Sequence, residues 1–335
     1  MRKGADLNVY EAAAAFRASI LAGEASLVKQ LEGAWRVGLR RIKRRLAYVE
    51  REIAAAQAAG SDFSPSWLYR QERFVALIDQ IEREIAILSA TASVKVAKRA
   101  ADLVKQGERD ALAMIRATGV SGDFLHSNVK ALEEIVGQLS DGSPLNELFQ
   151  ALGPEAVTSA RLVFAEGLIE GSNPRKIAAR LLEKIDVPRR RATLIARTET
   201  LRAYRSANQL VYRQNADIVS GVRISSSRDS RTCPYCLGQD GKILKHGEQF
   251  ATHPGCRCAL VPVIIGYTPD RGTGDEWLRT QPDAHALELL GPSRYKLWKS
   301  GEVDLASMLE YPNHPRWGLG VKFIPLKRLV GGGVV

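Results

Sequence analysis

The cysteines of this chain are confined to one short segment. All four lie between Cys233 and Cys258 in a chain of 335 residues. Two ligand-type residues separated by two others form a turn that can close on one metal ion, and the segment contains two such pairs, Cys233/Cys236 and His253/Cys256. Two such turns at the ends of a hairpin predict a tetrahedral, structural zinc site of the zinc-ribbon type.

The segment offers five donors for four positions. We favour Cys233, Cys236, His253 and Cys256 as the ligands, with Cys258 replacing His253 if the imidazole faces away. We expect that Cys256 and Cys258 do not share one ion. The spacing leaves two other interpretations open, namely two disulfides and reduced thiols in a small core.

A catalytic metal is disfavoured by the residues around the cysteines. A catalytic zinc keeps an open position and needs a nearby general base. The close carboxylates are Asp229, Asp240 and Glu248, and nothing in their spacing places them over the metal. The segment contains two histidines, His246 and His253, which are too few for a histidine-rich nuclease centre. We therefore expect no catalytic residues here.

Short strands are expected on both sides of the cysteines. Residues 219–225 alternate between apolar and polar, and residues 259–265 form an apolar run that contains Pro262. Proline cannot donate to a ladder, so this second strand is predicted at a sheet edge. Glycines at positions 238 and 241 predict a hairpin turn, followed by a short strand at 242–245.

The first half of the chain reads as long helices. Residues 9–57 lack proline and carry apolar side chains at three- and four-residue steps, and residues 67–104 repeat this pattern after a Gly/Ser/Pro break. Together they predict an antiparallel helical hairpin. Further helices are expected at 102–136 with a break near Gly119, at 145–152, after Pro154, at 175–185 and at 189–216.

Basic side chains are concentrated on the first of these helices. The chain carries a net charge of +11, which favours contact with polyanions such as nucleic acid. Six cations within ten residues predict a nucleic-acid-binding face, made by Arg36, Arg40, Arg41, Lys43, Arg44 and Arg45. The alternative is a solvated helix face whose charges are partly paired with glutamates in neighbouring turns.

Other features place limits on the cell biology of the chain. It has no run of about 20 apolar residues, so no membrane span is predicted, and its first residues do not resemble a signal peptide. Cysteines gathered in one cluster fit a reducing cytoplasm better than a secreted disulfide scaffold. Three tryptophans in the last quarter, Trp277, Trp298 and Trp317, are expected to pack around the small sheet.

Several motifs carry a resemblance to a known family. In chain order they are IARTET (195–200), DSRTCPYC (229–236), Asp240-Gly241, HPGCRC (253–258), GDEWL (274–278), the LG…R…W…G pattern of 290–301, and Trp317-Gly318. This set resembles the phage Mu F-like head morphogenesis domain, over roughly 189–329. The predicted organisation is a helical domain (1–188), this domain (189–330) and a flexible tail (331–335), in a mostly helical α+β fold.

The resemblance implies a non-enzymatic minor head protein of a tailed phage or prophage. It implies that the protein lies in the capsid interior near the portal, and in the host cytoplasm during assembly. Its implied partners are the portal protein and other capsid or scaffolding proteins. A role in DNA packaging or ejection, through sequence-independent DNA contact, would follow. The alternatives are a metal-dependent enzyme that processes nucleic acid and a zinc-ribbon module that binds DNA.

Overall fold

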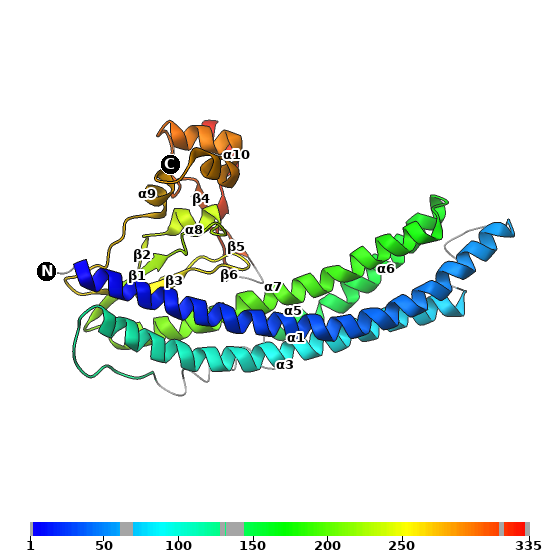
Figure 1. Ribbon diagram of the computed structural model, residues 1–335, viewed down its shortest axis with the longest axis horizontal. Helices are drawn as coiled ribbons and strands as arrows, with labels where there is room; N and C mark the ends of the chain where they lie inside the picture. The colour runs from blue at the N-terminus through cyan, green and yellow to red at the C-terminus, as the bar shows by residue number, and fades with distance from the viewer. Residues whose placement is uncertain (1–2, 61–69, 128–130, 132–143, 315–317, 332–335) are drawn as a thin grey trace. The chain divides into compact units, whose positions relative to one another are not determined.

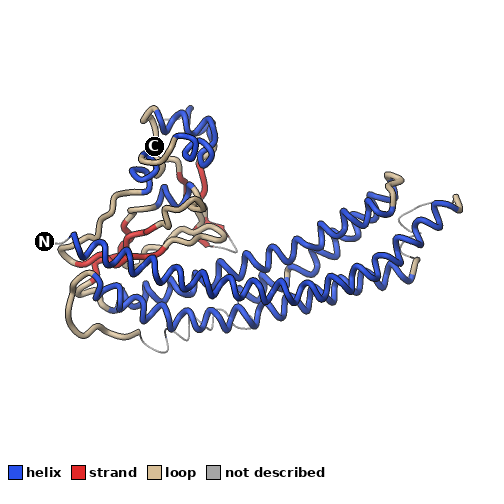
Figure 2. Tube along the Cα trace, viewed as in Figure 1, coloured by secondary structure: helices blue, strands red, loops and turns tan. Residues whose placement is uncertain are grey.

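A computed structural model describes residues 3–60, 70–127, 131, 144–314 and 318–331 (Figure 1). Helices dominate these residues, and the strands are few and short, as the colouring by secondary structure shows (Figure 2). The predicted fold class, α+β and mostly helical, is confirmed. Within the described residues no helix combines the length and the apolar character needed to cross a membrane.

The chain groups into two compact units that are not contiguous in sequence. The first comprises Met1–Ala22, Ala100–Val136 and Thr200–Val335, and the second comprises Gly23–Arg99 and Gly137–Glu199. Three of the four boundaries fall inside long helices, and the fourth, at 136/137, lies outside the described residues. Residue 188, the predicted end of the helical domain, lies within helix α7 (Pro174–Gln214) and at none of these boundaries.

The second unit is helical. It contains most of α1 (Lys3–Ala58), the first half of α3 (Glu72–Ala117), α5 (Pro144–Gln150), α6 (Leu152–Ile169) and the start of α7. Side chains pair Gln30 with Lys95 and Arg41 with Glu84, so residue numbers rise along α1 as they fall along α3. The predicted antiparallel hairpin is confirmed, whereas its turn at 61–69 lies outside the described residues.

Apolar side chains at helical spacing form the core of this unit. On α1 and α3 the fully buried side chains are spaced by three or four residues or by sums of these steps, as the sequence pattern predicts: Leu31, Ile42, Leu46 and Ile53 on α1, and Phe74, Leu77, Ile81 and Ile85 on α3. Phe74 also meets Phe164 of α6 edge-on, with ring centroids 5.0 Å apart. Burial of this stripe, rather than helix propensity alone, stabilises helices of this length.

The first unit contains the small sheet. Its strands are β1 (Val219–Ser225), β2 (Ile243–Lys245) and β3 (Ala259–Ile264), all antiparallel, in the order β2-β1-β3. The strands predicted at 219–225 and 259–265 are confirmed, and Pro262 does lie on an edge strand. Buried side chains of β1 and β3 share one apolar cluster with Ile115 of α3 and Tyr212 of α7.

Shorter elements complete the first unit. Helices α9 (Gly274–Arg279), α10 (Asp283–Lys299) and α11 (Leu326–Gly331) accompany two two-stranded ladders, which pair β4 (Leu309–Glu310) with β7 (Lys322–Phe323) and β5 (Asn313–His314) with β6 (Gly318–Leu319). Trp298 is buried in the α9–α10 core and Trp277 packs against it. Neither belongs to the apolar cluster of β1 and β3, around which we expected them to pack. Trp317 and residues 332–335 of the predicted tail lie outside the described residues.

Three local predictions are wrong. Residues 238–239 end helix α8 (Pro234–Gln239) instead of forming a hairpin turn, because the peptide after Cys233 closes into a helical turn. Residues 124–127 are not helical, since Gly119 and Gly122 adopt positive φ angles of 84° and 144° and end the helix. The helices predicted at 175–185 and 189–216 are one helix, α7, which continues through Pro188.

Candidate metal centre

The first pair of cysteines is positioned by the start of α8. Cys233 is the N-cap residue of this helix and Pro234 is its first residue, a position where the missing N–H costs nothing. The Sγ atom of Cys233 accepts a hydrogen bond from the backbone N–H of Cys236 at 3.4 Å. This turn brings both thiols to one side, which is what the C-x-x-C spacing predicts.

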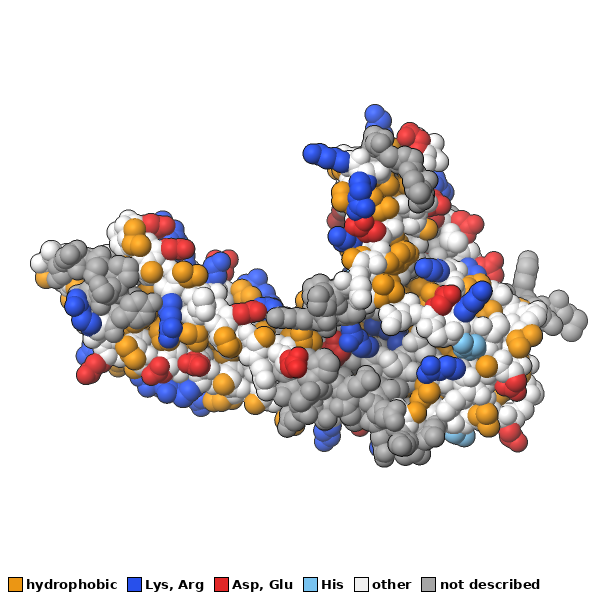
Figure 3. Space-filling model, turned by 180° about the vertical axis from the view of Figure 1, so that it is seen from behind, with side chains coloured by type: hydrophobic (Ala, Val, Ile, Leu, Met, Phe, Trp, Pro, Cys, Tyr) orange, Lys and Arg blue, Asp and Glu red, His pale blue; other side chains and the backbone are white. Residues whose placement is uncertain are grey.

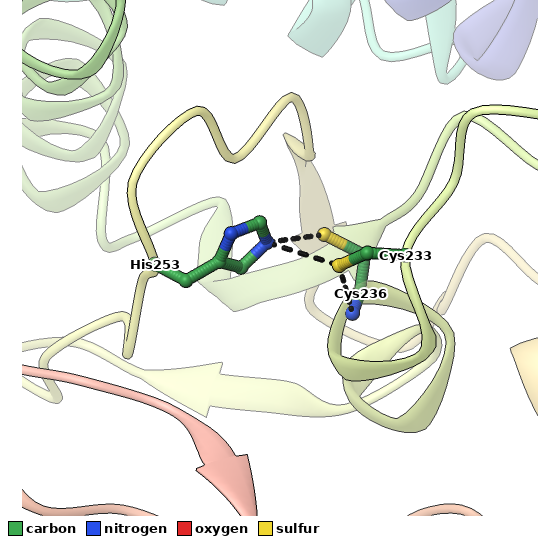
Figure 4. Close-up of side chains that lie close together, drawn as sticks. All are labelled: Cys233, Cys236 and His253. Atoms are coloured by element: carbon green, nitrogen blue, oxygen red, sulfur yellow. Dashed lines mark hydrogen bonds between the residues drawn. The ribbon is translucent and has the colours of Figure 1, made fainter. Parts of the chain in front are cut away.

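The second pair lies in the loop before β3. The backbone N–H of Cys256 donates to the carbonyl of His253 at 3.0 Å, and Gly255 between them adopts φ 75°, a conformation that favours glycine. The imidazole of His253 faces the first pair, and its Nε2 atom lies 3.1 Å from the Sγ atoms of both Cys233 and Cys236 (Figure 4). The two turns therefore meet at one point.

The tautomer of His253 suits a metal ligand. Its Nδ1 atom lies 3.0 Å from the carbonyl oxygen of Pro254, which can only accept, so Nδ1 carries the proton. In the neutral imidazole Nε2 then presents a lone pair to the thiols. A backbone carbonyl that fixes the ring in this way is the usual outer partner of a metal-bound histidine.

Three of the donor distances lie near those expected around a tetrahedral ion. Zinc bond lengths of about 2.3 Å to sulfur and about 2.0 Å to nitrogen place tetrahedral S···S and S···N pairs about 3.8 Å and about 3.5 Å apart. The Sγ atoms of Cys236 and Cys256 are 3.9 Å apart, and the two S···N distances are 3.1 Å. A small outward movement of the imidazole would complete the geometry.

Cys258 also reaches the cluster, contrary to our expectation. The donor atoms form two groups within 4.8 Å, Cys233/Cys236/His253 and Cys236/Cys256/Cys258, with Cys236 common to both. Side chains two residues apart on an extended segment project to the same side, which is why Cys256 and Cys258 converge. The cluster can hold a metal ion, and the choice of four ligands among the five donors stays a prediction.

The thiols are free and partly charged. None of the four cysteines forms a disulfide. The hydrogen bond from Cys236 lowers the pKa of Cys233 to about 5, against the effect of burial. Burial lowers the pKa of His253, but hydrogen bonds with Cys233 and Cys256 outweigh it and raise that pKa to about 10. A metal ion would displace the protons that its ligands still carry, because ligands bind in their deprotonated form.

The nearby carboxylates and the second histidine have other partners. Asp240 is buried and accepts from Ser226 and Arg228, Asp229 pairs with Arg257, and Glu248 accepts from the N–H of Lys245. The Nε2 atom of His246 contacts the carbonyl of Val219 at 2.6 Å. Among the described residues no carboxylate joins either donor group.

The predicted nucleic-acid-binding residues lie on the second unit, and all six are exposed. Arg41 is partly neutralised by buried Glu84 at 3.1 Å, and Arg45 donates to Gln80 at 3.1 Å. No carboxylate of the described residues pairs with the other four, Arg36, Arg40, Lys43 and Arg44. Elsewhere on the helices basic and acidic side chains are interspersed, as the face in Figure 3 shows.

A trough adjoins these residues between α1 and α3. It has a volume of about 600 Å³ and is lined mainly by Arg41, Arg44, Arg45, Tyr48, Arg51 and Gln80. The ring of Tyr48 is 50 % exposed and lies beneath the guanidinium of Arg51, at 4.6 Å from the ring centroid. Sequence reasoning missed Tyr48 and Arg51, although both follow the basic run at helical spacing.

Comparisons with known proteins agree with the resemblance seen in the sequence. Residues 159–261 match the family described as Phage Mu protein F like protein, a segment that includes β1, β2, the first half of β3 and all four cysteines. The chain is 29% identical over 133 residues to Minor head protein GP7 of Bacillus phage SPP1, which covers 34% of this chain and 43% of that protein. The alignment thus spans less than half of the relative. No solved structure matches.

Proposed function

Because residues 159–261 form a phage Mu protein F-like segment, we propose that this chain is a minor head protein of a tailed phage or prophage that acts in head morphogenesis. The observation that carries the proposal is this match together with the similarity to a minor head protein. In this role the chain lies inside the capsid near the portal and contacts the portal protein and other capsid or scaffolding proteins. It has no enzymatic activity of its own.

Head assembly offers a direct test. In a phage that encodes the chain, deletion of its gene should reduce the yield of infectious particles. Purified wild-type heads should contain a few copies by quantitative mass spectrometry, and pull-down with the portal protein should recover the chain. Full infectivity of the deletion, together with absence of the chain from purified heads, would exclude the proposed role.

Within this function the cysteine cluster binds one structural zinc ion. The support is the convergence of thiolate and imidazole donors at distances close to those of a tetrahedral site. A sheet of three short strands gains much of its stability from such an ion, since binding contributes directly to folding. Elemental mass spectrometry of protein purified under reducing conditions should find about one zinc per chain, with thiols protected until a chelator is added.

Single substitutions test the ligand set. Cys233→Ser and Cys236→Ser should release the metal and make the region around α8 sensitive to protease. His253→Gln and Cys258→Ser form a matched pair: we expect the first to lose zinc and the second to retain it. Full metal content in all four variants would exclude a metal centre built on these residues. If Cys258→Ser loses zinc and His253→Gln retains it, Cys258 is the fourth ligand in place of His253.

The exposed arginines of α1 support a second element of the proposal, sequence-independent DNA contact. Arg36, Arg40, Lys43 and Arg44 have no carboxylate partner among the described residues, and the trough beside them adds Arg51. Positive charge displayed in this way binds phosphates with a strong dependence on salt. Sequence-specific binding by the isolated zinc-ribbon segment would instead favour the DNA-binding module as the function.

Charge neutralisation tests the DNA contact. We would replace Arg40, Arg44 and Arg45 by Gln and leave Arg41 in place, because its removal would strand the buried carboxylate of Glu84. Affinity for duplex DNA should fall, and the salt slope should decrease by about 0.9 for each phosphate that is no longer neutralised. A control with equal charge loss replaces exposed residues of α6 and α7: Arg161, Arg175 and Lys184. Equal DNA affinities of the two triple variants would exclude the hypothesis that α1 carries a phosphate-binding face.

A further inference from the structure

Arg205 of α7 reaches the loop that carries the second pair of donors. Its side chain is 4% exposed, and its Nη1 atom donates to the carbonyl oxygens of Cys256 at 3.1 Å and Cys258 at 3.3 Å. The same nitrogen lies 3.7 Å from the Sγ atom of Cys256. One guanidinium from the helix thus contacts both ends of the three-residue segment and one of its sulfur atoms.

This arginine is buried without an acidic partner. No carboxylate of the described residues pairs with it, and its guanidinium carbon lies 5.3 Å from the ring centroid of Phe250. Buried charges are almost always paired, because an isolated ion in the interior loses its hydration. The counter-charge of Arg205 must therefore come from the sulfur cluster that it contacts.

The charge of a bound metal centre matches this requirement. Three thiolates, one neutral imidazole and Zn²⁺ carry a net charge of −1, and Arg205 brings the sum to zero. If Cys258 replaces His253, the charge becomes −2. Arg17 then provides a second cation, since it lines the same small cavity as Arg205 and Cys258. That cavity measures about 20 Å³, room for a single water.

We propose that Arg205 is a positioning residue of the metal centre, which holds the Cys256–Cys258 segment in its binding conformation and donates to the Cys256 thiolate. This inference rests on the proposed zinc site. The role has no local sign in the sequence, because Arg205 precedes Cys256 and Cys258 by about fifty residues and lies in a helix with several other arginines. Only the fold brings it to the sulfur atoms.

The test uses full-length protein and three variants. Arg205→Gln removes the charge, Arg205→Lys keeps the charge but cannot reach both carbonyls and the thiolate at once, and Arg213→Gln is a control at an exposed arginine of the same helix. Zinc affinity is measured by competition with a chromophoric chelator. We expect Arg205→Gln to bind zinc about 10- to 100-fold more weakly, the range seen for outer-shell partners. Arg205→Lys should recover part of the loss.

Cobalt substitution separates positioning from simple loss of fold. Without the hydrogen bond to Cys256, the thiolate-to-Co²⁺ charge-transfer band should move to lower energy in Arg205→Gln and stay unchanged in Arg213→Gln. Wild-type protein that binds neither zinc nor cobalt would overturn the metal centre itself. If the wild type binds zinc and both Arg205 variants bind it with an affinity within twofold of the wild-type value, only the role of Arg205 is overturned. If Arg205→Gln does not fold, the affinity of Arg205→Lys decides by the same criterion.

Discussion

The carboxylate of Asp240 joins the end of α8 to two loops of the first unit. Its side chain is 2% exposed. One oxygen accepts from the backbone N–H of Ser226 at 3.1 Å, and the other accepts from the hydroxyl of Ser226 at 2.9 Å and from Nε of Arg228 at 2.7 Å. Arg271 approaches the second oxygen at 3.9 Å. We therefore choose Asp240→Asn, which preserves shape and removes the charge.

The magnitude follows from what the asparagine leaves behind. Whichever way its amide is turned, an NH₂ group faces a former donor, either the N–H of Ser226 or Nε of Arg228. The side chain of Arg228 is 12% exposed, so it becomes a buried cation without its partner. Breaking a buried pair in this way costs about 3–5 kcal/mol. For a unit of this size, 1 kcal/mol lowers the melting temperature by about 2–4 °C, which gives a loss of about 6–20 °C.

Thermal unfolding by calorimetry measures this loss, with Asp270→Asn as the control. Asp270 pairs with Arg223 at 2.8 Å, but its side chain is 67% exposed. An exposed pair contributes about 0–1 kcal/mol, so the control should lose no more than about 4 °C. If both variants lose the same number of degrees in melting temperature, with unchanged zinc content, burial does not determine how much the Asp240–Arg228 pair contributes to stability.

Two further predictions concern helix packing and acid stability. Gly107→Ala should destabilise the protein by about 1–3 kcal/mol, because a Cβ atom there would lie 2.7 Å from a backbone carbonyl oxygen of α7. Gly33 has open space around it, so Gly33→Ala should stabilise the protein by up to about 1 kcal/mol. Chemical denaturation would compare the two variants. A hydrogen bond from Arg189 lowers the pKa of Asp186 in the folded state. This carboxylate therefore stabilises the fold fully at pH values above its unfolded pKa of about 3.9, and the stabilisation is lost as the pH falls through the lowered folded pKa. The difference in urea midpoint between wild type and Asp186→Asn should therefore be larger at pH 6 than at pH 3, and a pH-independent difference would contradict it.

Features with a local physical cause were predictable from the sequence. The C-x-x-C spacing predicted a turn with both thiols on one side, and Pro262 predicted an edge strand, because each constraint acts within a few residues. The hydrophobic repeat of the first two helices likewise predicted their antiparallel packing. These patterns hold wherever the chain is placed, so one sequence is enough to recognise them.

Features that depend on tertiary contact were not predictable. Pro188 reads as a helix boundary, yet α7 continues through it. Arg189, which follows the proline, pairs with Glu32 of α1 at 3.0 Å, a contact between segments far apart in the sequence. Likewise nothing near Arg205 in the sequence indicates that its guanidinium meets the cysteines. Such residues become visible only when distant segments are brought together.

Two features of the cluster, one that sequence reasoning placed only as a substitute ligand and one that it missed, point to the same physical conclusion. A fifth donor, Cys258, lies beside Cys256, and a buried guanidinium lies against both residues. A neutral thiol core would require neither, and it would leave Arg205 as an uncompensated charge in the interior. A thiolate cluster explains both, since it provides the missing negative charge and needs a cation to remain stable when buried. The arginine is therefore as informative about the chemistry of this site as the cysteines themselves.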